Sequence, residues 1–341
     1  MFWGSLSQRT ANVLPVPSET QQPLAIALQG GGAYGAYAWG VLDRVLEEED
    51  LPIAGFSGAS AGAINAVVAA WGLLEGGRAG ARDALRRLWT SVGKMSLLSP
   101  LGLPGASLQF DLLTRVISPY LFNPLNINPL RDLLVDMVDF ERLSADGRIP
   151  LFISATNVNT GEQRIFREEE ISVDVLMASS CIPYLSQAVV IDGQPYWDGG
   201  FSANPPILPL VLETACRSLL LVKLTADDEP DLPKAAPEIF ARLKRILFNA
   251  PLLRDLDALT EMQKLLHRTS PLPADLLRLR DLALHKITID HAFFGATSGS
   301  AFDPKPAMIA KLFDAGRAAA EESADVWMPA IVPESLAEAR H

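Results

Sequence analysis

The segment Gly58-Ala59-Ser60-Ala61-Gly62 constrains the fold more than any other part of the sequence. It follows a short apolar run at residues 53–56 and leads into an Ala-rich stretch that is expected to be helical. A strand, a sharp turn and a helix form the setting in which G-x-S-x-G acts as a nucleophile elbow. Gly58 and Gly62 would allow the tight turn and leave the Ser60 hydroxyl uncovered. An ordinary helix start capped by a serine is the plainer alternative.

A second glycine-rich turn lies upstream, where the apolar run 24–28 leads into Gln29 and then Gly30-Gly31-Gly32-Ala33-Tyr34-Gly35. An amphipathic helix is expected next, at about residues 36–49. Consecutive glycines let backbone N–H groups turn toward a ligand without obstruction by Cβ atoms. In a parallel sheet this turn and the elbow would both lie at the carboxyl ends of their strands. The N–H donors and the Ser60 hydroxyl are therefore expected to converge.

The same turn also matches G-x-G-x-x-G, the fingerprint of a dinucleotide-binding unit. That fingerprint expects an acidic residue about 20 positions further on, at the end of the second strand. Here the second strand ends at Phe56-Ser57 and continues into the elbow, while Asp50 precedes it. The sequence therefore favours an oxyanion hole, formed by the N–H groups of the turn, over a dinucleotide site.

The order strand, helix, strand, helix predicts an α/β fold with a central, mostly parallel sheet. Further strands are expected at residues 151–157, 162–167, 188–191, 195–197, 218–224 and 284–289. Further helices are expected at residues 61–74, 81–92, 173–180, 237–280 and 306–323. Residues 95–110 and 119–130 are apolar and irregular, which suits either connecting structure or an apolar rim around a lipid-binding mouth. We expect a loose arm at residues 1–22, a catalytic core at 23–225, and a mainly helical region at 226–341 that packs on the core or serves as a lid.

A serine hydroxyl needs a base before it can act as a nucleophile. The chain has four histidines: His267, His285, His291 and His341. The order Ser60, Asp198, His291 matches that of α/β-hydrolases, which keeps His291 open as the base. Asp198 is favoured instead, because it lies between the end of a predicted hairpin and Gly199-Gly200. A carboxylate with a pKa of about 4 is a weak base, so Asp198 would need burial and a hydrogen bond to Ser60. A simple turn former is the alternative for this aspartate.

The composition narrows the classes of protein. Hydrophobic residues make up 49% of 341 positions, and the net charge is -11. The charge argues against nucleic-acid binding, and any transient membrane contact is expected to be mainly apolar. Cys181 and Cys216, the only cysteines, indicate neither a disulfide framework nor a zinc site. No signal-peptide pattern and no apolar run of about 18 residues is present, so we expect a cytoplasmic protein, with signal-free secretion left open.

Three blocks together resemble the patatin-like phospholipase family: the turn Gly30 to Gly35, the elbow Gly58 to Gly62, and Asp198-Gly199-Gly200. The resemblance covers about residues 24–210. It implies a three-layer α/β/α fold and hydrolysis of lipid acyl esters through an acyl-enzyme, with a Ser–Asp dyad and without metal or cofactor. Where the family commonly has a basic residue, this chain has Tyr34, which supplies no positive charge.

By position, the resemblance implies that Ser60 is the nucleophile and Asp198 the base. It implies an oxyanion hole made by the backbone N–H groups of Gly31 and Gly32, with Gly30 as a further candidate. The glycines expected to support these turns are Gly35, Gly58, Gly62, Gly199 and Gly200. The expected function is a serine acyl hydrolase with a lipid or fatty-acyl ester as its partner. A polyester depolymerase or an acyltransferase would use the same dyad, and a non-catalytic lipid-binding module would share the fold. The motifs define no oligomeric state.

Overall fold

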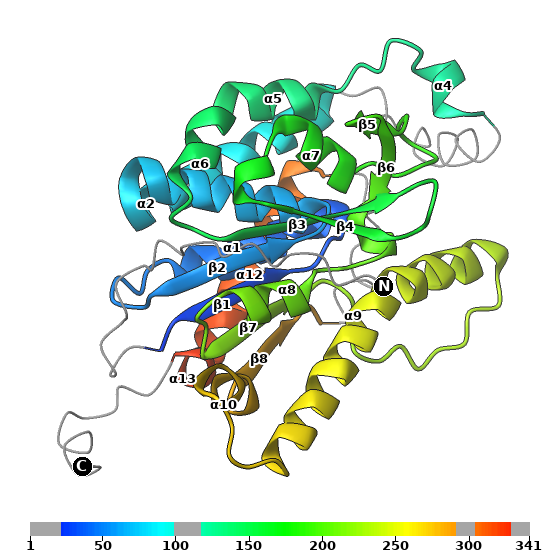
Figure 1. Cartoon of the computed structure of the whole chain (residues 1–341). Coiled ribbons are helices and arrows are strands. Elements are labelled where there is room, and N and C mark those ends of the chain that lie inside the picture. Colours follow the sequence, from blue (N-terminus) through cyan, green and yellow to red (C-terminus); the bar gives the residue numbers. More distant parts are fainter. Residues whose placement is uncertain (1–21, 99–116, 291–303, 329–341) are drawn as a thin grey trace.

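The computed structural model describes residues 22–98, 117–290 and 304–328. Within them, one eight-stranded sheet has the order β5-β6-β3-β2-β1-β7-β8, and β4 pairs with β3 beside this path (Figure 1). The strands are β1 Leu24–Leu28, β2 Ile53–Gly58, β3 Leu151–Asn157, β4 Gln163–Arg167, β5 Val189–Ile191, β6 Gln194–Asp198, β7 Ser218–Lys223 and β8 Ala283–Thr288. Strands β3, β2, β1, β7 and β8 are parallel, whereas β4, β5 and β6 join as antiparallel partners. The predicted mostly parallel sheet is confirmed.

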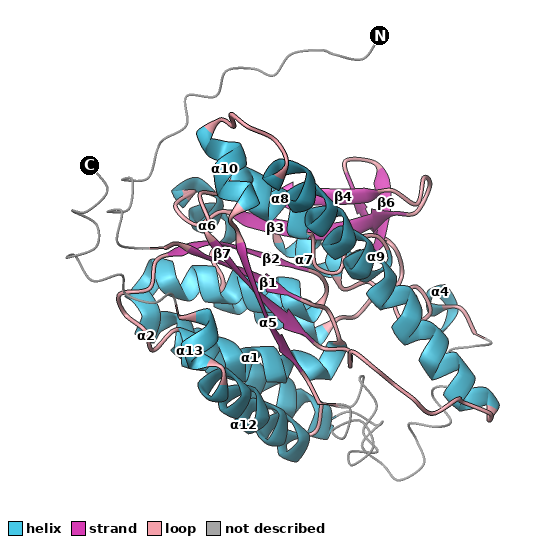
Figure 2. Cartoon of the chain, turned by 90° about the horizontal axis from the view of Figure 1, so that it is seen from below, coloured by secondary structure: helices cyan, strands magenta, loops and turns pink. Residues whose placement is uncertain are grey.

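Helices cover both faces of this sheet (Figure 2). One layer holds α1 Gly35–Val45, α2 Ala61–Leu98, α5 Pro129–Met137, α6 Phe140–Asp146, α7 Val173–Ser179, α12 Pro306–Glu322 and α13 Ala324–Trp327. The other holds α8 Ile207–Glu213, α9 Ala236–His267 and α10 Ala274–Arg280. The short α4, Pro119–Phe122, begins at the Ser118 cap. With the sheet between them, these two helical layers form the predicted three-layer α/β/α fold.

Burial on both faces explains why the sequence of strand β1 is apolar throughout. Leu24, Ile26 and Leu28 belong to the core under one helical layer, and Ala25 and Ala27 belong to the core under the other. All five are fully buried. A strand in the middle of a parallel sheet has no face left for water, so a continuous apolar run replaces the usual alternation.

Several predicted boundaries differ from the structure. The helix expected over 237–280 is divided, because α9 ends at His267 and α10 begins at Ala274. Pro271 and Pro273 lie between them, and a proline removes a backbone donor and cannot continue a helix. The helices expected at residues 61–74 and 81–92 are both part of α2, which has a kink between them where Gly76 and Gly77 have non-helical angles. Helix α1 ends at Val45 rather than near residue 49.

The expectations for the irregular apolar segments and for the N-terminal arm can be compared with the structure only in part. Residues 119–130 contain α4 and the start of α5, so this segment is more regular than predicted. Most of residues 95–110, and the arm at 1–22 apart from its last residue, lie outside the described residues. Among the described helices, none has the length and hydrophobicity that crossing a bilayer requires.

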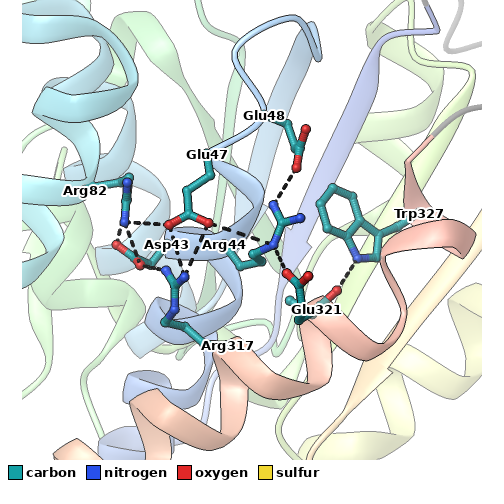
Figure 3. Close-up of polar contacts among 9 residues, drawn as sticks. Asp43, Arg44, Glu47, Glu48, Arg82, Arg317, Glu321 and Trp327 are labelled. Atoms are coloured by element: carbon teal, nitrogen blue, oxygen red, sulfur yellow. Dashed lines mark hydrogen bonds and ion pairs between the residues drawn. The ribbon is translucent and has the colours of Figure 1, made fainter. Parts of the chain in front are cut away.

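An ion-pair network joins the C-terminal helix α12 to the core (Figure 3). Asp43 of α1 accepts hydrogen bonds from Arg82 of α2, with a distance of 2.9 Å to Nε, and from Arg317 of α12. Both arginines also contact Glu47. Asp43 is buried, so its pairing offsets the cost of removing its charge from water. Helix α12 is therefore an integral part of one helical layer.

Candidate active site

Ser60 lies between the carboxyl end of β2 and the first turn of α2. Its φ is 53°, a left-handed conformation that is strained for a residue with a side chain. The two elbow glycines allow close packing around it. A Cβ on Gly58 would lie 2.5 Å from the backbone of Gly62, and a Cβ on Gly62 would lie 2.1 Å from the carbonyl oxygen of Leu28. These glycines therefore let the start of α2 pack closely against the ends of β2 and β1. This steric role is additional to exposing the serine.

The glycine-rich turn lies next to the elbow because β1 and β2 are paired, with Leu28 opposite Gly58. A Cβ on Gly30 would lie 2.8 Å from the carbonyl oxygen of Ala59 and 2.9 Å from the Cβ of Ser60. Only glycine fits so close to the serine. The sheet thus brings the predicted donors and Ser60 together.

The three N–H groups of this turn differ in their bonding. Gly30 N–H donates to Asn204 Oδ1 over 2.7 Å, so it is already used inside the protein. Neither Gly31 N–H nor Gly32 N–H donates to any other residue within the described part of the chain. Gly32 has a φ of 58°, a conformation that favours glycine. Gly31 and Gly32 therefore carry the donors that are left for a ligand.

Asp198 ends strand β6 and is fully buried. Its backbone is fixed by two hydrogen bonds of 2.8 Å. The Asp198 N–H donates to the Cys181 carbonyl, and Thr156 Oγ1 donates to the Asp198 carbonyl. Its side-chain Oδ1 accepts from Gly200 N–H over 2.7 Å. Oδ2 is buried and has no hydrogen-bond partner among the described residues. One carboxylate oxygen is thus held in place, while the other has no hydrogen-bond partner in the described ranges.

Burial raises the pKa of Asp198 to about 7, against the opposing effects of the hydrogen bond from Gly200 N–H and of the nearby Ser60 hydroxyl. Oδ2 itself accepts no hydrogen bond from the described residues. The Ser60 hydroxyl is therefore a neighbour of the Asp198 carboxyl group without a regular hydrogen bond to Oδ2.

The glycines after Asp198 are also required by packing. A Cβ on Gly199 would lie 2.2 Å from the Ser154 carbonyl oxygen of β3, and one on Gly200 would lie 2.4 Å from the Phe248 ring of α9. The Asp-Gly-Gly turn thus fits between the sheet and α9.

The family model for patatin-like phospholipases matches residues 26–211, more than half of the chain. The protein belongs to the patatin-like phospholipase family. The matched span contains the glycine turn, the elbow and the Asp198 loop, so the resemblance predicted from these blocks is confirmed. At the level of the family, this makes the chain a lipid acyl hydrolase. No curated protein matches the chain. Among solved structures, VipD from Legionella pneumophila aligns with 15% identity and a TM-score of 0.43, over 90% of this chain and 67% of that chain.

One residue that departs from the family pattern, Tyr34, lies near a positive charge from another element. Burial raises the pKa of Tyr34, and the nearby Arg245 of α9 lowers it by a smaller amount. Arg245 is held by Glu229, with 2.6 Å between Nη2 and Oε2. Arg245, paired with Glu229, is thus the cation of α9 whose charge acts on Tyr34 in this patatin-like protein.

The histidines give no support for a triad within the described residues. His285 is on β8, which β7 and β1 separate from β2 and its elbow, and burial lowers its pKa. His267 is at the exposed end of α9. His291 and His341 lie outside the described residues. The choice between Asp198 and His291 as the base therefore stays a prediction. No three His, Cys, Asp or Glu side chains in the described ranges gather as a metal site would require.

Two buried hydrogen bonds of this site could not be predicted from the sequence motifs. Ser179 of α7 accepts a hydrogen bond from Ser60 N–H over 2.9 Å, and Asn204 accepts one from Gly30 N–H. Both side chains are fully buried. The pairs are separated by 119 and 174 positions, so no local pattern joins them.

Gly30→Ala is expected to lower ester hydrolysis by about 100-fold, because the new methyl group would displace the turn from Ser60 and misplace the free N–H donors. The measurement is kcat on a soluble ester, with the melting temperature recorded alongside. Gly76→Ala is the matched control, since a Cβ at Gly76 meets nothing within 4 Å. Equal activity of the two variants would contradict the steric role of Gly30.

Proposed function

We propose that this protein is a serine acyl hydrolase that cleaves fatty-acyl esters of lipids, with Ser60 as nucleophile and Asp198 as base. The proposal is supported by the approach of Ser60 both to the buried Asp198 carboxyl, whose pKa the Ser60 hydroxyl lowers in part, and to the glycine turn, where a Cβ on Gly30 would lie 2.9 Å from the Ser60 Cβ. Nucleophile, base and oxyanion donors are the three parts that acyl transfer needs. Membership of the patatin-like phospholipase family supports a lipid acyl ester as the substrate.

The proposed reaction has two steps. Ser60 Oγ attacks the ester carbonyl carbon while Asp198 Oδ2 takes its proton, and the N–H groups of Gly31 and Gly32 bind the oxygen that becomes negative. The alcohol leaves with the proton that Asp198 held, and Ser60 carries the acyl group. Asp198 then takes a proton from water, the resulting hydroxide attacks the acyl carbon, and the proton returns to Ser60 as the fatty acid leaves.

The environment of Asp198 supports its use as a base. An ordinary aspartate, with a pKa near 4, holds a proton too weakly to take one from serine. Burial raises the pKa of Asp198 to about 7, which is closer to the value that suits general base catalysis at neutral pH. The unpaired Oδ2 is the atom that would receive the proton.

Activity is expected to rise as the pH increases through about 7, because only the ionised form of Asp198 accepts a proton and burial raises its pKa to that range. The measurement is kcat/KM on a soluble ester between pH 5 and 9. The pH dependence of this ratio reports the pKa of the base in the free enzyme. A profile that is already flat at pH 5 would contradict a buried carboxylate base with a raised pKa.

The test of the proposed function is covalent labelling with a fluorescent alkyl fluorophosphonate, followed by mass spectrometry of the modified peptide. Wild type, Asp198→Asn and His291→Ala are compared. We expect the label on Ser60, lost in Asp198→Asn and kept in His291→Ala. Loss of the label in His291→Ala would indicate a triad, and an unlabelled wild type that binds lipid would indicate a non-catalytic lipid-binding module.

A further inference from the structure

Asn204 follows the Asp198 loop and is fully buried. Both ends of its carboxamide are bonded: Oδ1 accepts from Gly30 N–H over 2.7 Å, and Nδ2 donates to the Phe248 carbonyl over 2.9 Å. The orientation of the amide is unambiguous, because a backbone N–H can only donate and a carbonyl can only accept. A buried amide bonded at both ends holds its two partners in a fixed relation.

The glycine turn needs such a fixed partner. Gly30, Gly31 and Gly32 have no Cβ atoms, so their backbones have few intrinsic preferences. An oxyanion hole stabilises the transition state only if its donors are already oriented before the reaction. Asn204 holds Gly30 N–H, which fixes the peptide from which the two unused donors of the turn continue.

The other end of the Asn204 amide is attached to α9, and a second contact joins the same place. Asn249, the residue after Phe248, accepts from Thr225 Oγ1 over 3.0 Å and from Gln29 Nε2 over 3.3 Å. Gln29 immediately precedes the glycine turn, and its Oε1 accepts from Leu224 N–H over 2.7 Å. Two consecutive residues of α9 thus hold the start of the turn through two separate polar contacts.

We propose that Asn204 is a positioning residue that orients the Gly30–Gly32 turn for oxyanion stabilisation and fastens it to α9. This inference rests on the proposed function. Because Asn204 is fully buried, it acts through the turn. Its loss is therefore expected to weaken binding of the transition state while leaving substrate binding unchanged.

The test uses Asn204→Ala and Asn204→Leu. Both remove the two hydrogen bonds, and leucine also keeps the volume of the side chain. We expect kcat on a soluble p-nitrophenyl ester to fall by about 10- to 100-fold, with KM within about twofold of wild type. The inhibition constant of an alkyl trifluoromethyl ketone, which forms an oxyanion on Ser60, should rise by a similar factor.

Thr214→Val is the matched control. It also removes a buried hydrogen bond from a side chain to a backbone carbonyl, that of Leu210, but in the loop that follows α8 and outside the site. Its melting temperature is expected to fall while kcat and the inhibition constant stay at the wild-type values. A loss of kcat in both Thr214→Val and the Asn204 variants would show a general effect of lost stability and overturn the inference.

Hydrogen exchange of the Gly30 amide in wild type, followed by NMR, gives a readout that needs neither activity nor a variant. We expect slow exchange at Gly30, as its bond to Asn204 requires. Fast exchange there would overturn the inference, as would folded Asn204 variants with wild-type kcat. A wild type that hydrolyses no ester and takes no label on Ser60 would instead contradict the proposed function, while slow exchange would still support the role of Asn204 in holding the turn.

Discussion

Ser60→Ala is expected to lower ester hydrolysis by about 10³-fold or more and to abolish fluorophosphonate labelling. The hydroxyl is the proposed attacking group, and no other residue in the proposed reaction can form the acyl-enzyme. The backbone of Ser60 is held by its N–H contact with Ser179 and by the packing of Gly58 and Gly62, none of which needs the hydroxyl. The melting temperature should therefore change little.

The control for this variant is Ser323→Ala, which removes a hydroxyl that donates to the Ala319 carbonyl at the end of α12. That variant is expected to keep full activity. If Ser60→Ala retained wild-type turnover with the protein free of contaminating esterase, the nucleophile would have to be another residue, and the proposed function would lose its basis.

Asp198→Asn is expected to lower kcat by about 10³-fold, because the amide has nearly the shape of the carboxylate but cannot take a proton. Its oxygen can still accept from Gly200 N–H, so the loop should keep its conformation. The loss should not be recovered by raising the pH. Retained activity in Asp198→Asn would require a different base, with His291 the candidate to substitute next.

The same variant is expected to be more stable than wild type above pH 7. Burial raises the pKa of Asp198 in the folded protein above its value in the unfolded chain. Folding thus favours the protonated form, and the wild type loses stability as the pH rises from about 4, where the unfolded chain ionises, to about 7, where the buried carboxyl ionises as well. An amide never ionises, so it does not carry this cost. Melting temperatures of both proteins at pH 5 and pH 8 check this: the advantage of Asp198→Asn should be larger at pH 8 than at pH 5.

The sequence was sufficient for the parts of the site that local backbone chemistry determines. Each glycine-rich block follows an apolar strand, and parallel strands have their carboxyl ends at one edge, so the convergence of Ser60 with the turn at Gly30–Gly32 could be predicted. The order of strands and helices likewise predicted a mostly parallel sheet, and the match to the family model confirmed the resemblance that these blocks indicated.

Contacts between distant segments could not be predicted. Asn204 and Ser179 hold the turn and the elbow across 174 and 119 positions, and a single buried Asn or Ser gives no periodic signal. The same reason applies to Arg245, whose charge lowers the pKa of Tyr34 from a helix that carries no recognised motif. The division between α9 and α10 differs from the single helix expected over 237–280, although Pro271 and Pro273 are a local signal for it, because a proline cannot continue a helix.

The pairing of β1 with β2, which sets Leu28 opposite Gly58, has a consequence for engineering. Main-chain hydrogen bonds in the middle of the sheet join the two strands that lead to the proposed nucleophile and to the glycine turn, and the contact of Asn204 with Gly30 N–H then fixes the position of the turn. Segments that connect the outer helices, such as residues 117–128, can therefore be exchanged between related proteins without changing that arrangement. Libraries that vary those segments would leave the pairing of β1 with β2, and with it the placement of the reacting groups, unchanged.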